Sequence, residues 1–296
     1  LVKLAEKNKD IVAITAAMSS GTGLNEFAEA YHDRFFDVGI AEQHAVSMAA
    51  GMAKQGLVPV VAIYSSFLQR AYDMLIHDVS LLNLHVVFCV DRAGLVGSDG
   101  ETHHGVFDVD YLCSVPGMQV LCPSSFAELE QMLDTAINEM DGPVAIRYPR
   151  GGEGAYKVIS TGGTEVLRHG SDITLAAYGT MINQMLELSE ALAKDGISAE
   201  VIKISQIKPL STDEIIASLK KTKKLLTAED VCEHGCIGEA LLSAAEEAGI
   251  CLEGASICTL GEGIVTHGTV TELYKDCGLD TEALYKKAVT LVRGAK

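Results

Sequence analysis

The sequence predicts an α/β fold made of two consecutive three-layer α/β/α domains with mostly parallel sheets. First, the chain has 296 residues, which is enough for two domains that each bury a hydrophobic core. Second, strand and helix signals alternate in two successive series. Third, the predicted strands are short, apolar and rich in β-branched residues. They have no alternating polar face, which is typical of parallel strands covered by helices on both sides.

The first series of strands and helices occupies residues 1–150, which we expect to form the first domain. Its helical segments repeat apolar residues at intervals of three and four, so one face of each helix packs on the sheet. We expect strands at residues 11–17, 35–38, 58–63, 86–91, 119–122 and 144–148, and helices at residues 42–55, 67–83 and 125–140.

A glycine-rich stretch separates the two series. Residues 151–163 (GGEGAYKVISTGG) contain five glycines and no sustained period, so we expect a linker at residues 151–165 and a second domain at residues 166–296. In the second domain we expect strands at residues 173–177, 200–205, 224–228 and 256–260, and helices at residues 181–194, 212–220, 237–248, 269–277 and 281–291.

Composition excludes several classes of function. The net charge of −17 makes nucleic acid and anionic membranes poor partners. No stretch approaches the roughly 20 apolar residues that a membrane helix needs. No signal peptide is visible, although the first residue is Leu1 rather than Met. The eight cysteines show no paired framework, which suits a reducing cytoplasm.

One cysteine cluster has some metal-ligand character, namely Cys232, His234 and Cys236. A structural zinc site needs four ligands, and no fourth ligand follows at a useful spacing. We therefore expect two buried thiols that flank a loop histidine, and no metal ligands in this chain.

Candidate functional residues follow the predicted strands of the first domain. Ligands of open parallel sheets bind beyond the carboxyl ends of the strands. These positions carry charged and aromatic side chains, where a loop without a function would carry Ser, Gly or Asn. Arginine there, in an acidic chain, indicates an anionic substrate. The candidates are Glu42, Tyr64, Phe67, Arg70, Arg92, Asp99, His103 and Arg150.

Several candidates also have a purely structural interpretation. Glu42 starts a helix of small residues, where a carboxylate complements the helix dipole. Phe67 is equally a core residue by its position, and Arg70 a surface residue. The loop at residues 91–107 is long and glycine-rich and carries several ionisable side chains, which is typical of functional or mobile loops.

Long motifs of the first domain, in the right order, resemble one enzyme family. They are similar to the pyrimidine-binding domain of the 1-deoxy-D-xylulose-5-phosphate synthases, thiamine-diphosphate enzymes of the transketolase superfamily. The resemblance runs from about residue 11 to residue 150 and continues more loosely through the C-terminal domain. The motifs are FDVGIAEQHAV (residues 36–46), PVVAIYSSFLQRAYD (59–73), DRAGLVGSDGETHHGVFD (91–108) and RYPRG (147–151).

This resemblance implies catalytic and cofactor-binding roles. Glu42 would hydrogen-bond N1′ of the aminopyrimidine of thiamine diphosphate and thereby activate the cofactor. Phe67 would stack on the pyrimidine ring. His103 would transfer protons during the reaction.

The resemblance also implies the substrate-binding residues. Arg92 and Arg150 would hold the substrate's phosphate, the use already indicated by rare arginines in an acidic chain. The complete implied substrate-binding set is Tyr64, Arg70, Arg92, Asp99, His103 and Arg150.

The implied reaction condenses pyruvate with glyceraldehyde 3-phosphate to 1-deoxy-D-xylulose 5-phosphate and CO₂, which leads into isoprenoid (terpenoid) and thiamine biosynthesis. A cytoplasmic homodimer is implied as well. The family's Mg²⁺ ligands lie in an N-terminal domain with a Gly-Asp-Gly motif, and no Gly-Asp-Gly occurs here. We therefore expect the chain to need an N-terminal domain or subunit for activity, either as a fragment or as one subunit of a split enzyme.

Two other functions stay open. The chain could be the C-terminal subunit of a split transketolase or a 2-oxo-acid dehydrogenase β subunit, which share the two-domain plan. The segments DRAG (residues 91–94) and THHG (102–105) favour the synthase, although His104 stands where many of its relatives have Gln. The chain could also be a non-catalytic dimerisation module, since the small-residue helix at residues 45–53 suits close packing. The presence of every matched site residue favours an enzyme.

Overall fold

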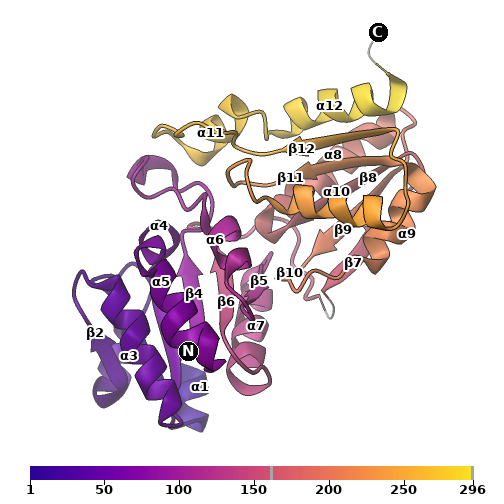
Figure 1. Ribbon diagram of the computed structural model, residues 1–296. Helices are drawn as coiled ribbons and strands as arrows, with labels where there is room; N and C mark the ends of the chain where they lie inside the picture. Colours follow the sequence, from indigo (N-terminus) through magenta and orange to yellow (C-terminus); the bar gives the residue numbers. More distant parts are fainter. Residues whose placement is uncertain (161–162, 295–296) are drawn as a thin grey trace. The chain divides into compact units, whose positions relative to one another are not determined.

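The computed structural model describes residues 1–160 and 163–294, and the chain divides into two compact units (Figure 1). The first unit comprises Leu1–Val96, Thr102–Leu121 and Leu129–Arg150, and the second comprises Gly97–Glu101, Cys122–Glu128 and Gly151–Lys296. The domain limits at residues 1–150, 151–165 and 166–296 stay predictions. Residues 161 and 162 of the predicted linker, and residues 295 and 296, lie outside the described part of the chain.

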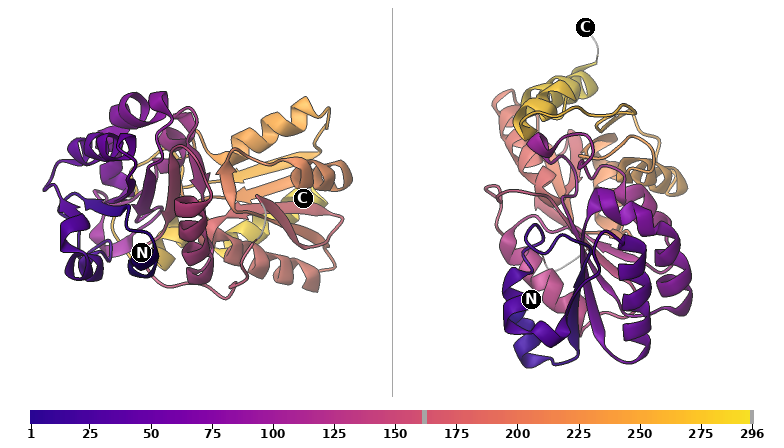
Figure 2. Two further views of the ribbon diagram at one scale, coloured as in Figure 1. Left: turned by 90° about the horizontal axis from the view of Figure 1, so that it is seen from below. Right: turned by 90° about the vertical axis from the view of Figure 1, so that its left-hand side faces the viewer.

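The first unit is built on a parallel sheet with the strand order β5-β6-β4-β3-β1-β2. Every pairing between these strands is parallel, and helices lie on both faces (Figure 2). Two strands, β1 and β4, are buried along their whole length, as their apolar sequences predict. The strands are β1 (Ile11–Thr15), β2 (Phe35–Asp37), β3 (Val58–Tyr64), β4 (Val87–Asp91), β5 (Gln119–Leu121) and β6 (Val144–Tyr148).

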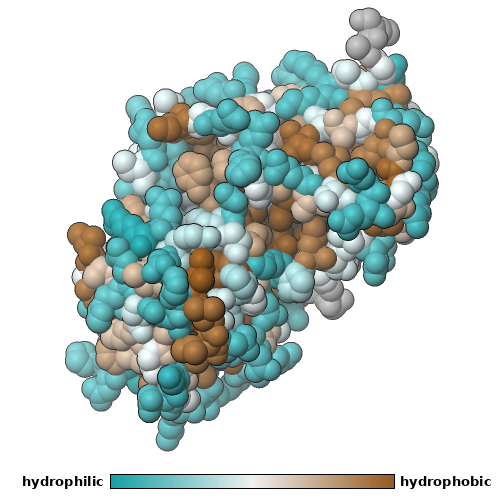
Figure 3. All heavy atoms as spheres, in the orientation of Figure 1, coloured by the Kyte–Doolittle hydropathy of each residue, from teal (hydrophilic) through white to brown (hydrophobic). Residues whose placement is uncertain are grey.

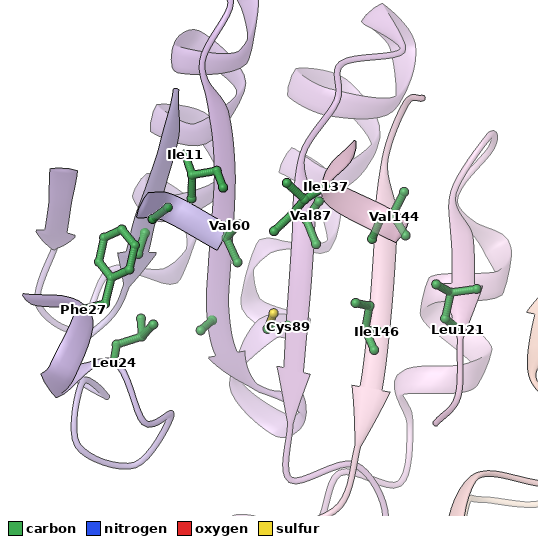
Figure 4. Packing of buried hydrophobic residues seen from close by; sticks show 14 residues of the cluster. Ile11, Leu24, Phe27, Val60, Val87, Cys89, Leu121, Ile137, Val144 and Ile146 are labelled. Atoms are coloured by element: carbon green, nitrogen blue, oxygen red, sulfur yellow. The ribbon is translucent and has the colours of Figure 1, made fainter. Parts of the chain in front are cut away.

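Helices α1 (Val2–Lys7), α2 (Asn25–Ala30) and α7 (Phe126–Asn138) supply one face of the core. Figure 4 shows Phe27 of α2 and Ile137 of α7 packed with Ile11, Val60 and Val144 of the strands. Helix α3 (Glu42–Lys54) packs against β3, and α6 (Asp108–Ser114) precedes β5. Of these helices, α1, α2 and α6 were not predicted.

The helix predicted at residues 67–83 is wrong as one continuous helix. The segment begins as α4 (Ser65–Leu68) and continues as the 3₁₀ turn Gln69–Ala71, α5 (Tyr72–Met74), the π-helical turn Leu75–Val79 and the 3₁₀ turn Ser80–Leu82. The buried residues Leu68, Ala71, Leu75 and Val79 keep helical spacing through these changes of winding. Apolar periodicity therefore located the segment but carried no information about its winding.

The second unit contains a five-stranded sheet with the order β12-β11-β8-β9-β7. Four strands are parallel, and β7 runs antiparallel to β9. The strands are β7 (Thr164–Arg168), β8 (Ile173–Tyr178), β9 (Ala199–Ile204), β11 (Lys224–Ala228) and β12 (Gly254–Cys258), with β10 (Gln206–Lys208) outside this sheet. The helices are α8 (Ile182–Lys194), α9 (Asp213–Thr222), α10 (Ile237–Glu247), α11 (Val270–Asp276) and α12 (Thr281–Arg293).

The edge strand β7, which begins at Thr164, is a strand that the sequence analysis did not predict. All its residues are only half-buried, so it lacks the continuous apolar run that revealed the central strands. The predicted fold class is confirmed, since both units are mostly parallel sheets with flanking helices.

The surface is mainly hydrophilic on the face shown in Figure 3, with separate apolar patches. Large apolar side chains with high exposure in the first unit include Ile40, Leu81 and Leu82. Within residues 1–160 and 163–294, no helix combines the length and apolar character needed to cross a membrane.

Candidate active site

The candidate residues of the first unit lie at the carboxyl edge of its sheet. Tyr64 is the last residue of β3, and α4 follows at once. Arg92 follows β4 directly, and Arg150 lies just beyond β6. Because these strands are parallel and paired, their carboxyl ends meet at one edge, where ligands of such sheets bind.

Three rings form an aromatic cluster at this edge. The rings of Tyr64 and Phe67 are stacked, with centroids 5.7 Å apart. The imidazole of His103 meets Phe67 edge-on at 5.1 Å and lies 6.3 Å from Tyr64. His103 also shares a hydrogen bond between its Nδ1 and Thr102 Oγ1, at 2.9 Å. The loop histidine and the α4 turn are therefore held together in the folded chain.

Glu42, the first residue of α3, is the buried acid of the cluster. Its side chain is 2% exposed, and Arg70 Nη1 donates to its Oε1 at 2.9 Å. The Arg70 guanidinium also lies 5.2 Å from the Phe67 ring centroid. A carboxylate that only complemented the helix dipole would not require this burial or this partner.

Arg92 is fixed by three neighbours. Its Nη1 donates to the carbonyl oxygen of Gly21 at 3.0 Å and to Asp91 Oδ1 at 3.1 Å, and its guanidinium lies 3.7 Å over the Tyr64 ring. Its backbone adopts φ 60°, which is uncommon for a residue with a side chain. Arg92 Nε is buried and has no hydrogen-bond partner among the described residues. An additional acceptor, such as an anion oxygen, would satisfy it.

Arg150 is exposed, and its charge acts on the same buried carboxylate as that of Arg92. Burial raises the pKa of Asp91 above its ordinary value, while Arg92 and Arg150 both oppose the increase. Both guanidinium groups therefore favour the ionised form of Asp91.

Asp99 differs from the other candidates in its location. It lies in the 3₁₀ turn Gly97–Asp99, within a loop segment that belongs to the second unit. There, the backbone of Gly97 packs closely on Gly268. Seven candidates therefore belong to the first unit, and Asp99 to the second.

Sequence reasoning missed the loop that follows β1, at residues 16–24. A Cβ added to Gly21 would lie 1.6 Å from the hydroxyl oxygen of Tyr64, so a larger residue at this position would force the Tyr64 ring to move. The Tyr64 backbone N–H donates to Met18 Sδ at 3.5 Å. The loop carries no ionisable group, and its one usable signal was the GTG glycine spacing at residues 21–23.

The loop that carries His103 has a closed neck. Gly94 and Gly105 exchange two backbone hydrogen bonds of 2.8 Å, and the Val96 N–H donates to His104 Nδ1 at 3.1 Å. In this arrangement the Nδ1 atom of His104 is a hydrogen-bond acceptor. His104, which stands where many relatives have Gln, thus has a structural role inside the loop.

A buried ion pair holds the segment that follows the neck. Arg147 donates from Nε and Nη2 to the two oxygens of Asp108, at 2.9 Å and 3.2 Å. Farther along α6, the Tyr111 hydroxyl donates to the Ser65 carbonyl at 3.0 Å. These contacts connect α6 with the sheet and with the α4 turn.

The structure shows no metal-binding cluster of three or more His, Cys, Asp and Glu side chains among its described residues. In the cluster considered for zinc, Cys236 is buried, and burial raises its pKa to about 12. Cys232 is only half-buried, and its thiol donates to the His234 carbonyl at 3.3 Å. The expectation of two buried thiols is therefore correct for Cys236 and wrong for Cys232.

The residues present fit the pyrimidine end of thiamine diphosphate. Glu42 offers a buried carboxylate with one oxygen in an ion pair, and Phe67 offers a partly accessible ring beside it. An acceptor for a ring nitrogen and a flat apolar surface are what an aminopyrimidine requires.

Comparison with known proteins identifies the protein family of this chain. Residues 1–152 match the transketolase pyrimidine binding domain, and residues 162–284 match the transketolase C-terminal domain. The chain therefore belongs to the transketolase family.

Within that family, the chain is similar to curated 1-deoxy-D-xylulose-5-phosphate synthases. It is 46% identical to the synthase of Gloeobacter violaceus over 293 residues, which cover 97% of this chain and 46% of the relative. It is also 46% identical to that of Thermomicrobium roseum over 298 residues, which cover 99% and 47%. The chain thus spans about half the length of the curated relatives it matches, and the resemblance seen in its motifs is confirmed.

A solved structure described as a split gene transketolase, inactive β4 tetramer, has the same fold. The TM-score is 0.86 at 29% identity, and the match covers 99% of this chain and 96% of that one.

Proposed function

We propose that this chain is the C-terminal part of a thiamine-diphosphate-dependent, transketolase-type transferase that condenses pyruvate with glyceraldehyde 3-phosphate. The product would be 1-deoxy-D-xylulose 5-phosphate, with release of CO₂. The observation that carries this proposal is the convergence of Glu42, Phe67 and His103 at one sheet edge. The names of the curated relatives supply the particular reaction.

When bound, thiamine diphosphate supplies the carbon nucleophile of this chemistry. The carboxylate of Glu42 would hydrogen-bond the pyrimidine N1′ and hold a proton there. Phe67 would pack against the pyrimidine ring and orient it. His103, adjacent to both rings of the cluster, exchanges protons with the substrate oxygen.

The two arginines act on the substrate's anionic end. Arg92 has a buried Nε without a partner among the described residues, and Arg150 is exposed, with a charge that acts on Asp91. Charge-assisted hydrogen bonds from guanidinium groups suit a phosphate. Tyr64 supports Arg92 through its ring face. Asp99 and Arg70 complete the proposed substrate-binding set.

The remaining part of the enzyme would hold the diphosphate. We propose that Mg²⁺ and its ligands lie in an N-terminal domain or subunit, because the chain spans about half of its relatives. We further propose a cytoplasmic homodimer. Ile40, Leu81 and Leu82 are exposed apolar side chains of the first unit, and their burial between two copies would favour association.

Combination with an N-terminal domain tests this function. In calorimetry, the chain alone should bind thiamine diphosphate no more tightly than about 1 mM, because one hydrogen bond and one stacked ring contribute about 1 kcal/mol each. Addition of the N-terminal part of a synthase, with Mg²⁺, should give much tighter binding and product formation. Tight Mg²⁺-dependent binding by this chain alone would show that the diphosphate site has been assigned to the wrong part.

A second candidate is the C-terminal subunit of a split transketolase, favoured by the structure match over 96% of that chain. The same assembled enzyme distinguishes the two functions. Turnover of pyruvate supports the synthase, whereas turnover only of ketose phosphates as donors supports the transketolase.

Replacement of Arg150 by alanine should raise the apparent KM for glyceraldehyde 3-phosphate. A charged hydrogen bond to phosphate contributes about 1.5–3 kcal/mol, so we expect an increase of about 10- to 100-fold, with pyruvate decarboxylation less affected. Steady-state assays with unphosphorylated glyceraldehyde provide the control, since its KM should not change. An equal loss with both aldehydes would contradict a phosphate-binding role.

A further inference from the structure

We propose that Arg70 is a positioning residue for Glu42, in addition to any contact that it makes with substrate. In this view Arg70 fixes the Glu42 carboxylate so that one oxygen stays directed at the pyrimidine. The inference rests on the proposed function and concerns the cofactor end of the same site. The role that it assigns to Arg70 is in activation of the cofactor, which takes place before any substrate binds.

The contact joins a buried acceptor to an accessible donor. Glu42 is 2% exposed, whereas the Arg70 side chain is 49% exposed. An ion pair between two exposed side chains would have little consequence. A buried carboxylate is different, because it requires partners that satisfy its oxygens. Arg70 Nη1, at 2.9 Å, is the partner of Oε1.

The geometry leaves the second oxygen available. Arg70 Nη1 donates to Oε1, and the ion pair between these side chains involves this one carboxylate oxygen. A carboxylate rotates about its terminal bond over a broad range, so an acid without this contact would direct its oxygens less uniquely. The ion pair to Oε1 would therefore hold the carboxylate in an orientation that leaves Oε2 for the pyrimidine N1′.

Arg70 also links Glu42 to the second pyrimidine-binding group. It follows Phe67 by three residues, across the change from α4 to the 3₁₀ turn Gln69–Ala71. Residues three apart lie on the same side of such tight turns. The guanidinium consequently lies 5.2 Å from the Phe67 ring centroid while it contacts Glu42. One side chain thus sets the carboxylate and the ring relative to each other.

The test uses the complete enzyme that contains this chain, with variants Arg70→Met and Arg70→Lys. Two measurements made without substrate report on the cofactor end: the Kd of thiamine diphosphate with Mg²⁺, and the rate at which the cofactor's C2 proton exchanges with deuterium, followed by NMR. We expect Arg70→Met to slow this exchange by about 10- to 100-fold, because small displacements of a catalytic group have effects of this size. Arg70→Lys should restore part of the rate.

Each outcome separates the possible roles. If Arg70→Met leaves the Kd and the exchange rate unchanged and raises only the KM of a substrate, Arg70 is a substrate ligand and the inference is wrong. Gln69→Met, an exposed neighbour in the same turn, should leave both measurements unchanged. If the unmodified complete enzyme binds no thiamine diphosphate, the proposed function fails instead.

Discussion

Glu42→Ala is expected to abolish measurable turnover in the assembled enzyme, with a loss of at least about 10³-fold. The substitution removes the buried carboxylate that we propose holds a proton at the pyrimidine N1′. Glu42→Gln preserves the size of the side chain and one hydrogen bond but cannot hold that proton as an acid, so it should also be severely impaired. Turnover at saturating cofactor, measured for both variants, provides the result.

The same substitution should leave the fold intact. Glu42→Ala deprives Arg70 of its partner, but the Arg70 side chain is about half exposed and can be solvated instead. The expected change in the free energy of unfolding is therefore on the order of 1 kcal/mol or less. Circular dichroism and thermal unfolding of the isolated chain check this point. Full activity in Glu42→Ala would refute the proposed mechanism.

The sequence predicted the central strands well because burial on both faces forces a recognisable composition. Strands such as β1 and β4 are entirely buried, and their apolar runs leave few other interpretations. The edge strand β7 has no fully buried residue, so its sequence resembles a loop. Short helices such as α1, with six residues, span too few turns to show a period.

The candidate site was predictable to the level of the strand that carries each residue. Parallel strands end at one edge, so Tyr64 and Arg92 had to approach each other once the strand order was known. Contacts between side chains could not be predicted from the sequence, because they depend on rotamers and on the paths of the loops. The ion pair of Arg70 with Glu42 and the passage of Gly21 across Tyr64 are of this kind.

Gly105→Ala should have the largest effect of any conservative substitution in the loop that carries His103. A Cβ at this position would lie 2.2 Å from the carbonyl oxygen of Arg92 and 2.4 Å from Ser65 Oγ. Real Cβ atoms do not approach other atoms so closely, and the obstructing carbonyl belongs to the backbone, so a rotamer change cannot relieve the contact. The neck bonded between Gly94 and Gly105 would have to open.

We expect Gly105→Ala to lower the free energy of unfolding by roughly 3 kcal/mol, at the upper end of the usual cost of overpacking. Activity should fall further than stability alone explains, because the displaced neck carries His103 away from Phe67. Gly51→Ala is the matched control, since a Cβ at Gly51, within α3, meets no atom within 4 Å. Replacing a helical glycine by alanine stabilises by about 0.5–1 kcal/mol.

The same chemical change, glycine to alanine, should therefore have opposite effects at the two positions. Two measurements on both variants check this: urea unfolding of the isolated chain and turnover of the assembled enzyme. Gly105→Ala should shift the unfolding midpoint down and reduce turnover even at temperatures where the variant remains folded. Gly51→Ala should shift the midpoint slightly up and preserve turnover. If Gly105→Ala unfolds at the same urea concentration as the unmodified chain and keeps its activity, the neck is not the rigid support for His103 that its hydrogen bonds and close packing indicate.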